Sequence, residues 1–300
     1  VLLYMLMLVK NFLIQAPCIF IIAGILFFLT RVPAVQDALF QRLAQNLIST
    51  APNIFPEEDS LSALVCGSKS PLPHPTRAET CVMIKAGEET FIFDVGNKSI
   101  DNLRNWRVPL NQLNSIFISH LHSDHIAELP EIHMWNWIGT GRQSKLKVYG
   151  PEGINQVLNG FTEAFSLDWK YRNDHHGDKF APLKAAGFDG YEITDFSEPV
   201  YESNGIVITA FLVDHKPIDP SLAFKIEYKG RSIVLSGDTI YSEAILNNSK
   251  NVDVLFHEAF HKGTLDMMYN ALPANASARI ALVDIQNYHT NTIEVANLAK

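Results

Sequence analysis

The sequence has few cysteines and few basic side chains, and both shortages narrow the functions open to it. Only 3 of the 300 residues are cysteine, and Cys66 and Cys81 lack the spacing of a zinc-binding pair. The 24 lysine and arginine residues stand against 32 aspartate and glutamate residues, so the net charge is −8, and no basic cluster is evident. Because affinity for a phosphate backbone comes largely from basic side chains, this balance disfavours nucleic acid as a partner. The sequence also has no internal repeat, which excludes a repeat architecture.

A long apolar segment lies near the N-terminus. Phe12 to Leu29 contains no charged residue, and Lys10 and Arg31 flank it. A helix of this segment, at about 1.5 Å per residue, would come close to the bilayer hydrocarbon thickness of about 30 Å. We expect residues 1–34 to form a membrane anchor, with a signal peptide as the alternative. The rest of the chain would then be membrane-anchored or exported, outside the cytoplasmic membrane.

The remaining sequence predicts a short connecting region and one large mixed domain. Residues 35–60 are predicted to form a short amphipathic helix (35–48) followed by a linker. Residues 61–300 are predicted to form the globular domain. Strand-like runs occur at 61–66, 81–84, 90–95, 116–119, 146–149, 206–213, 223–228, 233–236 and 252–256. Helices are expected at 126–137, 151–165, 276–285 and 292–300, with 171–190 irregular. Strands in two groups with helices alongside fit two sheets packed face to face, with the helices outside.

Two local details can be predicted. Asn275 is expected to cap the helix over 276–285, and Thr290 the helix that follows it. Cys66 and Cys81 are expected to be small buried core residues; a disulfide between them is the alternative if the domain is exported.

The stretch from His120 to His125 reads His-Leu-His-Ser-Asp-His and directly follows the apolar run Ser115 to Ser119. Side chains alternate in an extended segment, so His120, His122 and Asp124 should point to one side. His125 can join them if the chain turns into a helix there. Imidazole nitrogens and a carboxylate are donors that zinc selects, so the stretch predicts a metal site rather than an ordinary polar loop.

This H-x-H-x-D-H motif resembles the signature of the metallo-β-lactamase-fold hydrolases. His215 follows at the end of another apolar run, and Asp238 lies in a Ser-Gly-Asp-Thr turn like that of the family. The segments 257–260 and 288–296 resemble motifs of the branch that contains ribonuclease Z and arylsulfatase-like enzymes. The resemblance runs from about residue 61 to the end of the chain. It implies a four-layer αββα sandwich.

The resemblance also implies two divalent metal ions, chiefly Zn²⁺, with Mn²⁺ or Fe²⁺ as alternatives. The implied ligands are His120, His122, Asp124, His125, His215 and Asp238. The first ion would be bound by His120, His122 and His215, and the second by Asp124 and His125. Asp238 would bridge the two ions.

The implied chemistry is hydrolysis by a metal-bridged hydroxide whose pKa falls towards 7. Asp124 would orient the hydroxide, and His289 would donate a proton to the leaving group. In this branch a seventh ligand, a histidine, follows further along the chain. It would lie beyond Lys300, so we expect the C-terminal end of the domain to be missing from this sequence.

Three functions are compatible with these motifs. The first is hydrolysis of a small-molecule ester, of the phosphodiester or aryl sulfate type. The second is transfer-RNA 3′ processing, as in ribonuclease Z. It is opposed by the apolar N-terminus, by the acidic balance, and by the short segment between His215 and Asp238, where nuclease members carry an insertion. The third is a non-catalytic metal-binding domain. Assembly as a homodimer is left open.

Overall fold

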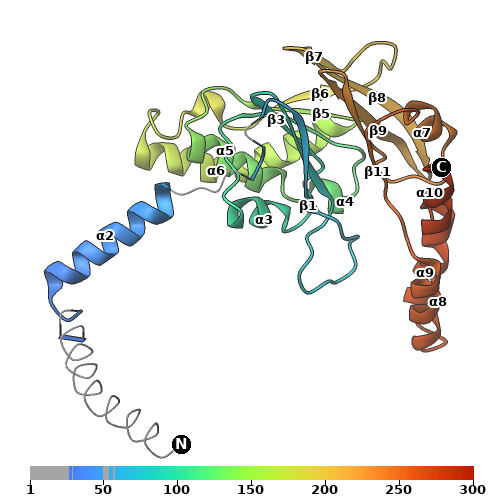
Figure 1. Ribbon diagram of the computed structural model, residues 1–300, viewed down its shortest axis with the longest axis horizontal. Helices are drawn as coiled ribbons and strands as arrows, with labels where there is room; N and C mark the ends of the chain where they lie inside the picture. Colours follow the sequence, from blue (N-terminus) through green and yellow to red (C-terminus); the bar gives the residue numbers. More distant parts are fainter. Residues whose placement is uncertain (1–26, 29, 50–53, 57) are drawn as a thin grey trace, which may run out of the picture. The chain divides into compact units, whose positions relative to one another are not determined.

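The computed structural model of the protein describes residues 27–28, 30–49, 54–56 and 58–300 (Figure 1). The chain divides into two compact units, residues 1–52 and residues 53–300. In the first unit α2 runs over Pro33–Ser49, which confirms the helix predicted at 35–48. The anchor predicted at residues 1–34 lies outside the described residues except for 27–28 and 30–34. No described helix has the length and apolar character needed to cross a bilayer.

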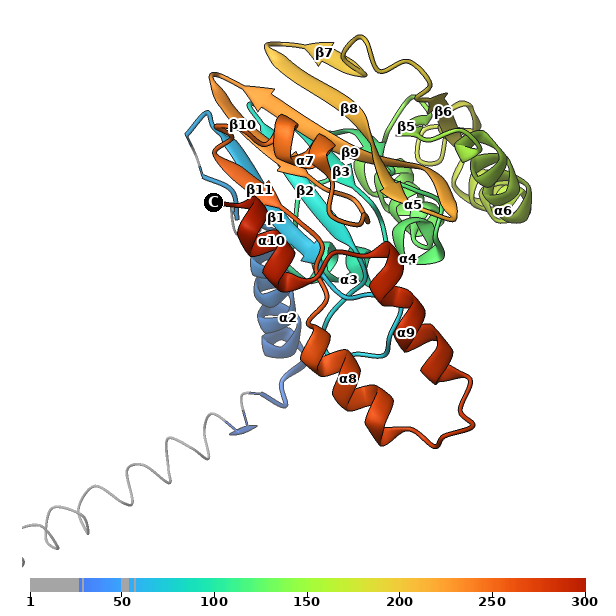
Figure 2. The ribbon, with the colours of Figure 1, turned by 90° about the vertical axis from the view of Figure 1, so that its right-hand side faces the viewer.

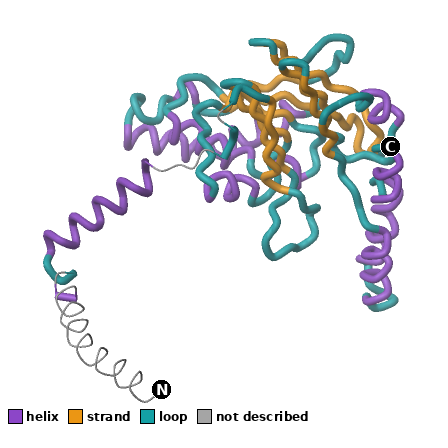
Figure 3. The backbone as a smooth tube through the Cα atoms, viewed as in Figure 1, coloured by secondary structure: helices purple, strands orange, loops and turns teal. Residues whose placement is uncertain are grey.

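Two β-sheets form the centre of the second unit (Figures 2 and 3). The first sheet has the order β1-β2-β3-β4-β5-β6, with strands Leu61–Gly67, Cys81–Ala86, Glu89–Phe93, Leu113–Phe117, Leu146–Gly150 and Phe188–Glu192. Its first three strands are antiparallel, and β3 to β6 are parallel. The second sheet has the order β11-β10-β9-β8-β7, with β7 to β11 spanning Tyr201–Ser203, Ile206–His215, Ile218–Tyr228, Arg231–Leu235 and Val254–Phe256. Its strands are antiparallel apart from the parallel pair β10 and β11.

Three apolar cores lie between the layers. Successive side chains of a strand point to opposite faces of its sheet, so one strand can contribute to two cores. In β3, Phe91 and Phe93 face the core between the two sheets, whereas Ile92 faces the opposite core. That opposite core is covered by residues of α3 (Ser99–Asn105), α5 (Leu129–Thr140) and α6 (Ile154–His176), such as Trp137 of α5 and Trp169 of α6. A smaller core lies beneath α7 (Glu243–Asn248) and α10 (Thr292–Leu298) on the outer face of the second sheet. The mixed α/β fold with helices outside two facing sheets is therefore confirmed.

The helices of the second unit are partly those predicted. They are α3 (Ser99–Asn105), α4 (Ser123–Ile126), α5 (Leu129–Thr140), α6 (Ile154–His176), α7 (Glu243–Asn248), α8 (Lys262–Ala271), α9 (Ala278–Tyr288) and α10 (Thr292–Leu298). The helix expected at 126–137 is split, because α5 begins anew with Pro130 in its first turn.

Several local predictions were wrong. Residues 171–176 continue α6, and β6 occupies part of the stretch expected to be irregular. Ser277, not Asn275, precedes α9. Asn291, not Thr290, caps α10, because its side chain accepts hydrogen bonds from the backbone N–H groups of Ile293 and Glu294.

α8 and α9, which lie side by side in Figures 1 and 2, extend away from the sheets.

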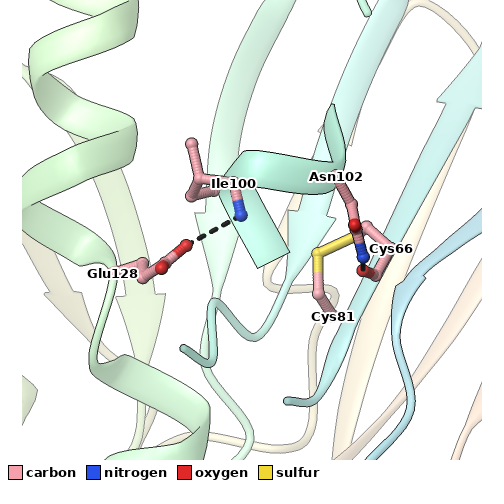
Figure 4. The surroundings of a disulfide bond; sticks show 5 residues. All are labelled: Cys66, Cys81, Ile100, Asn102 and Glu128. Atoms are coloured by element: carbon pink, nitrogen blue, oxygen red, sulfur yellow. Dashed lines mark hydrogen bonds between the residues drawn. A yellow bond between two sulfur atoms is a disulfide. The ribbon is translucent and has the colours of Figure 1, made fainter. Parts of the chain in front are cut away.

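Cys66 and Cys81 form a disulfide (Figure 4), so the preferred prediction of two unbonded core residues was wrong. β1 and β2 are antiparallel neighbours, and this pairing brings the two Cα atoms to 5.0 Å, within the range of disulfides. Next to the bond, Asn102 of α3 donates to the Cys66 carbonyl at 2.7 Å. The Ile100 N–H, also in α3, donates to Glu128 at 2.8 Å. The disulfide thus lies beside a helix that is hydrogen-bonded to the segment after the His120–His125 motif.

We predict that replacing both cysteines, Cys66→Ala with Cys81→Ala, lowers the free energy of unfolding by about 3 kcal/mol, as expected for a loop of about 15 residues. Urea unfolding measures the change. A reductant should destabilise the wild type by a similar amount and leave the double variant unaffected. With the bond, the oxidised, unfolded wild type has one free thiol, that of Cys18, and three free thiols would contradict the bond.

A buried histidine stands apart from the metal motif. His133 of α5 is 1% exposed and lies among Trp137, Trp169 and Phe188, with ring centroids 4.7–5.7 Å away. The Gly187 N–H donates to its Nε2 at 2.8 Å. Burial lowers the pKa of His133 to about 4, because the charged form would lose its hydration. The folded protein therefore favours the neutral ring.

This shift predicts an acid-sensitive step in stability. Between pH 6.5 and 4 the unfolded chain binds a proton at His133 that the folded chain does not, so stability falls as the pH falls. A shift of this size corresponds to about 3 kcal/mol. Urea unfolding across this pH range should show a flatter pH dependence for His133→Gln than for the wild type. His175→Gln, at the exposed end of α6, is the control, and equal slopes for all three proteins would exclude the effect.

Candidate metal centre

The predicted site residues lie where strands of both sheets end. Asp94 follows β3 and His120 follows β4, and these strands are parallel, so both residues come to one edge. His215 ends β8, and Asp238 follows β10. A backbone hydrogen bond of 2.9 Å from Leu222 of β9 to Ser119 joins the two sheets at this point. Residues far apart in sequence therefore meet at one edge of the sandwich.

Four histidines surround the carboxylate of Asp238. Its Oδ2 lies 3.4 Å from His125 Nε2, 3.9 Å from His120 Nε2, 3.9 Å from His289 Nδ1 and 4.0 Å from His215 Nε2. The structure brings these side chains together although their sequence positions span more than half of the chain.

His122 and Asp124 complete the cluster. The His122 Nδ1 lies 3.0 Å from His120 Nε2, and Asp124 Oδ2 lies 3.8 Å from His125 Nε2. Three overlapping groups have the spacing of metal ligands: His120, His122 and His215; His120, His125 and Asp238; and His215, Asp238 and His289. All six predicted ligands therefore lie in one cluster. Asp124 is at its margin, in none of the three groups, and His289 is an additional member.

The donor set fits a divalent cation. The Nε2 atoms of His125 and His215 are buried without a hydrogen-bond partner among the described residues. Burial lowers the pKa of His120 well below its ordinary value, and it also lowers the pKa of His122 and His215. These rings are therefore neutral and offer lone pairs. Burial alone would raise the pKa of Asp238, but the nearby His125 lowers it, so the carboxylate stays ionised.

A carboxylate that the sequence did not assign to the site orients His125. Asp94 Oδ2 lies 2.8 Å from His125 Nδ1, and the same carboxylate accepts hydrogen bonds from the N–H and Oγ of Ser119. Burial alone would lower the pKa of His125, yet Asp94 and Asp238 raise it well above its ordinary value. Bonding at Nδ1 leaves Nε2 facing the cluster, as carboxylate partners do for metal-bound histidines. The sequence feature that could have identified Asp94 is the Phe-Asp-Val-Gly turn after a buried strand.

Glu258 joins the Asp238 turn to the His289 segment. Its Oε1 accepts hydrogen bonds from the backbone N–H of Thr290 at 3.0 Å and of Thr239 at 3.3 Å, and lies 3.2 Å from His289 Nδ1. Burial raises the pKa of Glu258. Burial alone would lower the pKa of His289, but its hydrogen bond to Glu258 raises it. The adjacent His257 is in none of the ligand groups, and its Nδ1 donates to the Glu258 carbonyl at 2.6 Å.

Gly237 makes the turn at Asp238 possible. Its φ is +58°, and a Cβ at this position would come within 2.4 Å of the Leu222 carbonyl oxygen. Only glycine fits a left-handed conformation with the backbone this close. The turn can therefore present the Asp238 carboxylate to the cluster directly after β10.

Two facing sheets with a histidine and aspartate cluster at their common edge define the class of metallo-β-lactamase-fold hydrolases. Residues 65–297 match the family described as anti-Pycsar protein Apyc1, and the chain belongs to that family. It is 30% identical over 235 residues to a ribonuclease Z of Mycobacterium marinum, covering 78% of this chain and 79% of the relative. The resemblance noted from the motifs is confirmed.

Two solved structures show the same fold. The metallo-β-lactamase-fold protein YhfI of Bacillus subtilis has a TM-score of 0.55 at 19% identity, covering 81% of this chain and 82% of that one. The short form of human tRNase Z has a TM-score of 0.54 at 18% identity, covering 77% of this chain and 93% of that one.

We predict that Asp238→Ala lowers the metal content of the zinc-loaded protein by at least one ion per chain, because the variant loses the carboxylate that four histidines face. Plasma mass spectrometry after dialysis measures the content. Asp266→Ala, on the exposed surface of α8, removes the same charge and should have no effect. Equal metal content in Asp238→Ala and the wild type would show that Asp238 is not a ligand.

Proposed function

We propose that this chain is a dinuclear metal-dependent phosphodiesterase that hydrolyses a small ester. The observation that carries the proposal is the cluster around Asp238, in which histidines from three distant segments turn ring nitrogens towards one carboxylate. Such a set of imidazoles and carboxylates is suited to two divalent cations, and Zn²⁺ is the cation that it fits best.

Each ligand has a proposed place. One ion would be held by His120, His122 and His215, and the other by Asp124 and His125. Asp238 would bind both ions. When bound, divalent cations activate water and polarise the scissile ester bond. Among the described residues, the carboxylates of Asp124 and Asp238 pair with histidines and not with a lysine or arginine that would compete with a cation.

Two side chains would move protons. Burial raises the pKa of Asp124, which suits this carboxylate to orient the attacking water and to accept its proton. The leaving oxygen must gain a proton as its bond to phosphorus breaks, and His289 would donate it. Glu258, at 3.2 Å, stabilises the protonated ring of His289 and fixes its orientation.

The substrate is proposed to be small. Between His215 and Asp238 the chain consists of a tight turn, β9, a second turn and β10, so it carries no inserted arm there. The net charge of −8 offers little attraction to a polyanion. A phosphodiester is favoured over an aryl sulfate because the relative at 30% identity is named for a nuclease, and nucleases cleave phosphodiesters. That relative also makes transfer-RNA 3′ processing the second candidate.

A parallel assay separates the candidates. The zinc-loaded full chain is incubated with a bis-aryl phosphodiester, an aryl sulfate and a precursor transfer RNA. We expect the phosphodiester to be turned over fastest. Specific cleavage of the precursor RNA at comparable efficiency would replace the small-ester proposal with the nuclease, and preference for the sulfate would replace it with a sulfatase. Inactivity on all three substrates with two ions bound would favour a non-catalytic metal-binding domain.

We predict that His289→Ala spares metal content but slows hydrolysis, because the leaving oxygen loses its proton donor. The loss should be about 10²- to 10⁴-fold for an alkyl leaving group and much smaller for p-nitrophenolate, which needs no proton. Steady-state kinetics over a series of leaving groups measures it. His175→Ala, at the exposed end of α6, is the control. Equal slowing of every leaving group would argue against proton donation.

We also propose that the domain works outside the cytoplasmic membrane, held by the apolar N-terminal segment. The Cys66–Cys81 disulfide supports this placement, because such bonds persist mainly in oxidising compartments. Cell fractionation with thiol alkylation tests it: the protein should be in the membrane fraction with Cys66 and Cys81 protected from alkylation. Alkylation of Cys66 and Cys81 on a protein in the cytosolic fraction would contradict the placement.

A further inference from the structure

Tyr288 lies against the metal centre without belonging to the ligand groups. It is the last residue of α9, and its carbonyl accepts a hydrogen bond from His215 Nδ1 at 2.8 Å. Its ring centroid lies 5.3 Å from that of His215 and 4.7 Å from that of His289. Backbone and ring contacts therefore hold this side chain beside two histidines of the cluster.

The Tyr288 hydroxyl is a hydrogen-bond donor that the described residues leave unused. Among the residues that the structure describes, none forms a hydrogen bond with it, although the side chain is half-buried. A phenol has an ordinary pKa of about 10, so it keeps its proton at neutral pH and can donate. An unused donor at the edge of a catalytic cluster is available to a substrate.

The site needs such a donor. Asp124, Asp238 and Glu258 are carboxylates, and among the described residues their ion pairs are only with histidines. The histidine nitrogens that face the cluster are committed to the metal ions or to proton transfer. When a phosphodiester is attacked, negative charge grows on its non-bridging oxygens, and preorganised donors stabilise that charge. Within the described part of the chain, no arginine or lysine forms an ion pair with these carboxylates.

We infer that Tyr288 is a further catalytic residue, whose hydroxyl donates a hydrogen bond to a non-bridging oxygen of the bound phosphodiester. This inference rests on the proposed function. The phenol keeps its proton throughout, so no bond to Tyr288 forms or breaks. Its contribution differs from that of His289, because it stabilises the phosphoryl oxygens and not the leaving group.

The test uses Tyr288→Phe, which removes the hydroxyl and keeps the ring that packs on His215. With the zinc-loaded full chain we expect kcat for a bis-aryl phosphodiester to fall about tenfold to a hundredfold, with KM nearly unchanged and metal content equal to the wild type. In Tyr288→Phe, kcat should fall by the same factor for every leaving group. In His289→Ala, by contrast, the fall in kcat should depend on the leaving group. Tyr171→Phe, on the exposed face of α6 at 61% exposure, should match the wild type.

A second measurement keeps this inference separate from the proposed function. Inorganic phosphate should bind the metal-loaded Tyr288→Phe protein about fivefold more weakly than the wild type by calorimetry, whether or not any ester is turned over. An active wild type with an unchanged kcat and phosphate affinity in Tyr288→Phe would overturn the role of Tyr288 alone. A loss of kcat that comes with a loss of metal would also overturn it, because the residue would then act through His215.

Discussion

The structure of the centre depends on how the charge of one partly buried carboxylate is compensated. Asp238 Oδ2 has histidine nitrogens at 3.4–4.0 Å from four directions. An ionised carboxylate that is partly shielded from water is costly unless positive charge or donors surround it. Burial alone would lower the pKa of His125, but Asp94 and Asp238 raise it, so the carboxylates on either side favour positive charge at this ring. The same arrangement of acceptors favours a divalent cation.

The two sheets hold the side chains around Asp238 in fixed positions. The ligands leave the ends of strands that are hydrogen-bonded to their neighbours, and Ser119 links them to the second sheet through Leu222. A second set of contacts then fixes the rings: Asp94 holds His125, and the Tyr288 carbonyl holds His215. Because each ring is bonded at Nδ1, its Nε2 is presented to the cluster. The arrangement explains how one edge of a sandwich can bring histidine and carboxylate side chains from distant segments within a few ångströms.

The sequence predicted the parts of the site that are local. The His120–His125 motif carries its own spacing, and the strand before it sets the direction of its side chains. The resemblance of the Ser-Gly-Asp-Thr turn added Asp238, but no local pattern could show that Asp94 faces His125 across 31 residues. The disulfide was missed for the same reason, because it depends on the register of β1 with β2. The short strands β6 and β7 and the helix α8 carry too few periodic residues to stand out.

In the proposed centre, two metal ions share the Asp238 carboxylate. The decisive measurement is a crystal structure of the zinc-loaded full chain, with anomalous scattering recorded at the zinc edge. We expect two peaks on either side of Asp238, one within bonding distance of His120, His122 and His215 and the other of Asp124 and His125. A single peak, or peaks away from this carboxylate, would contradict it.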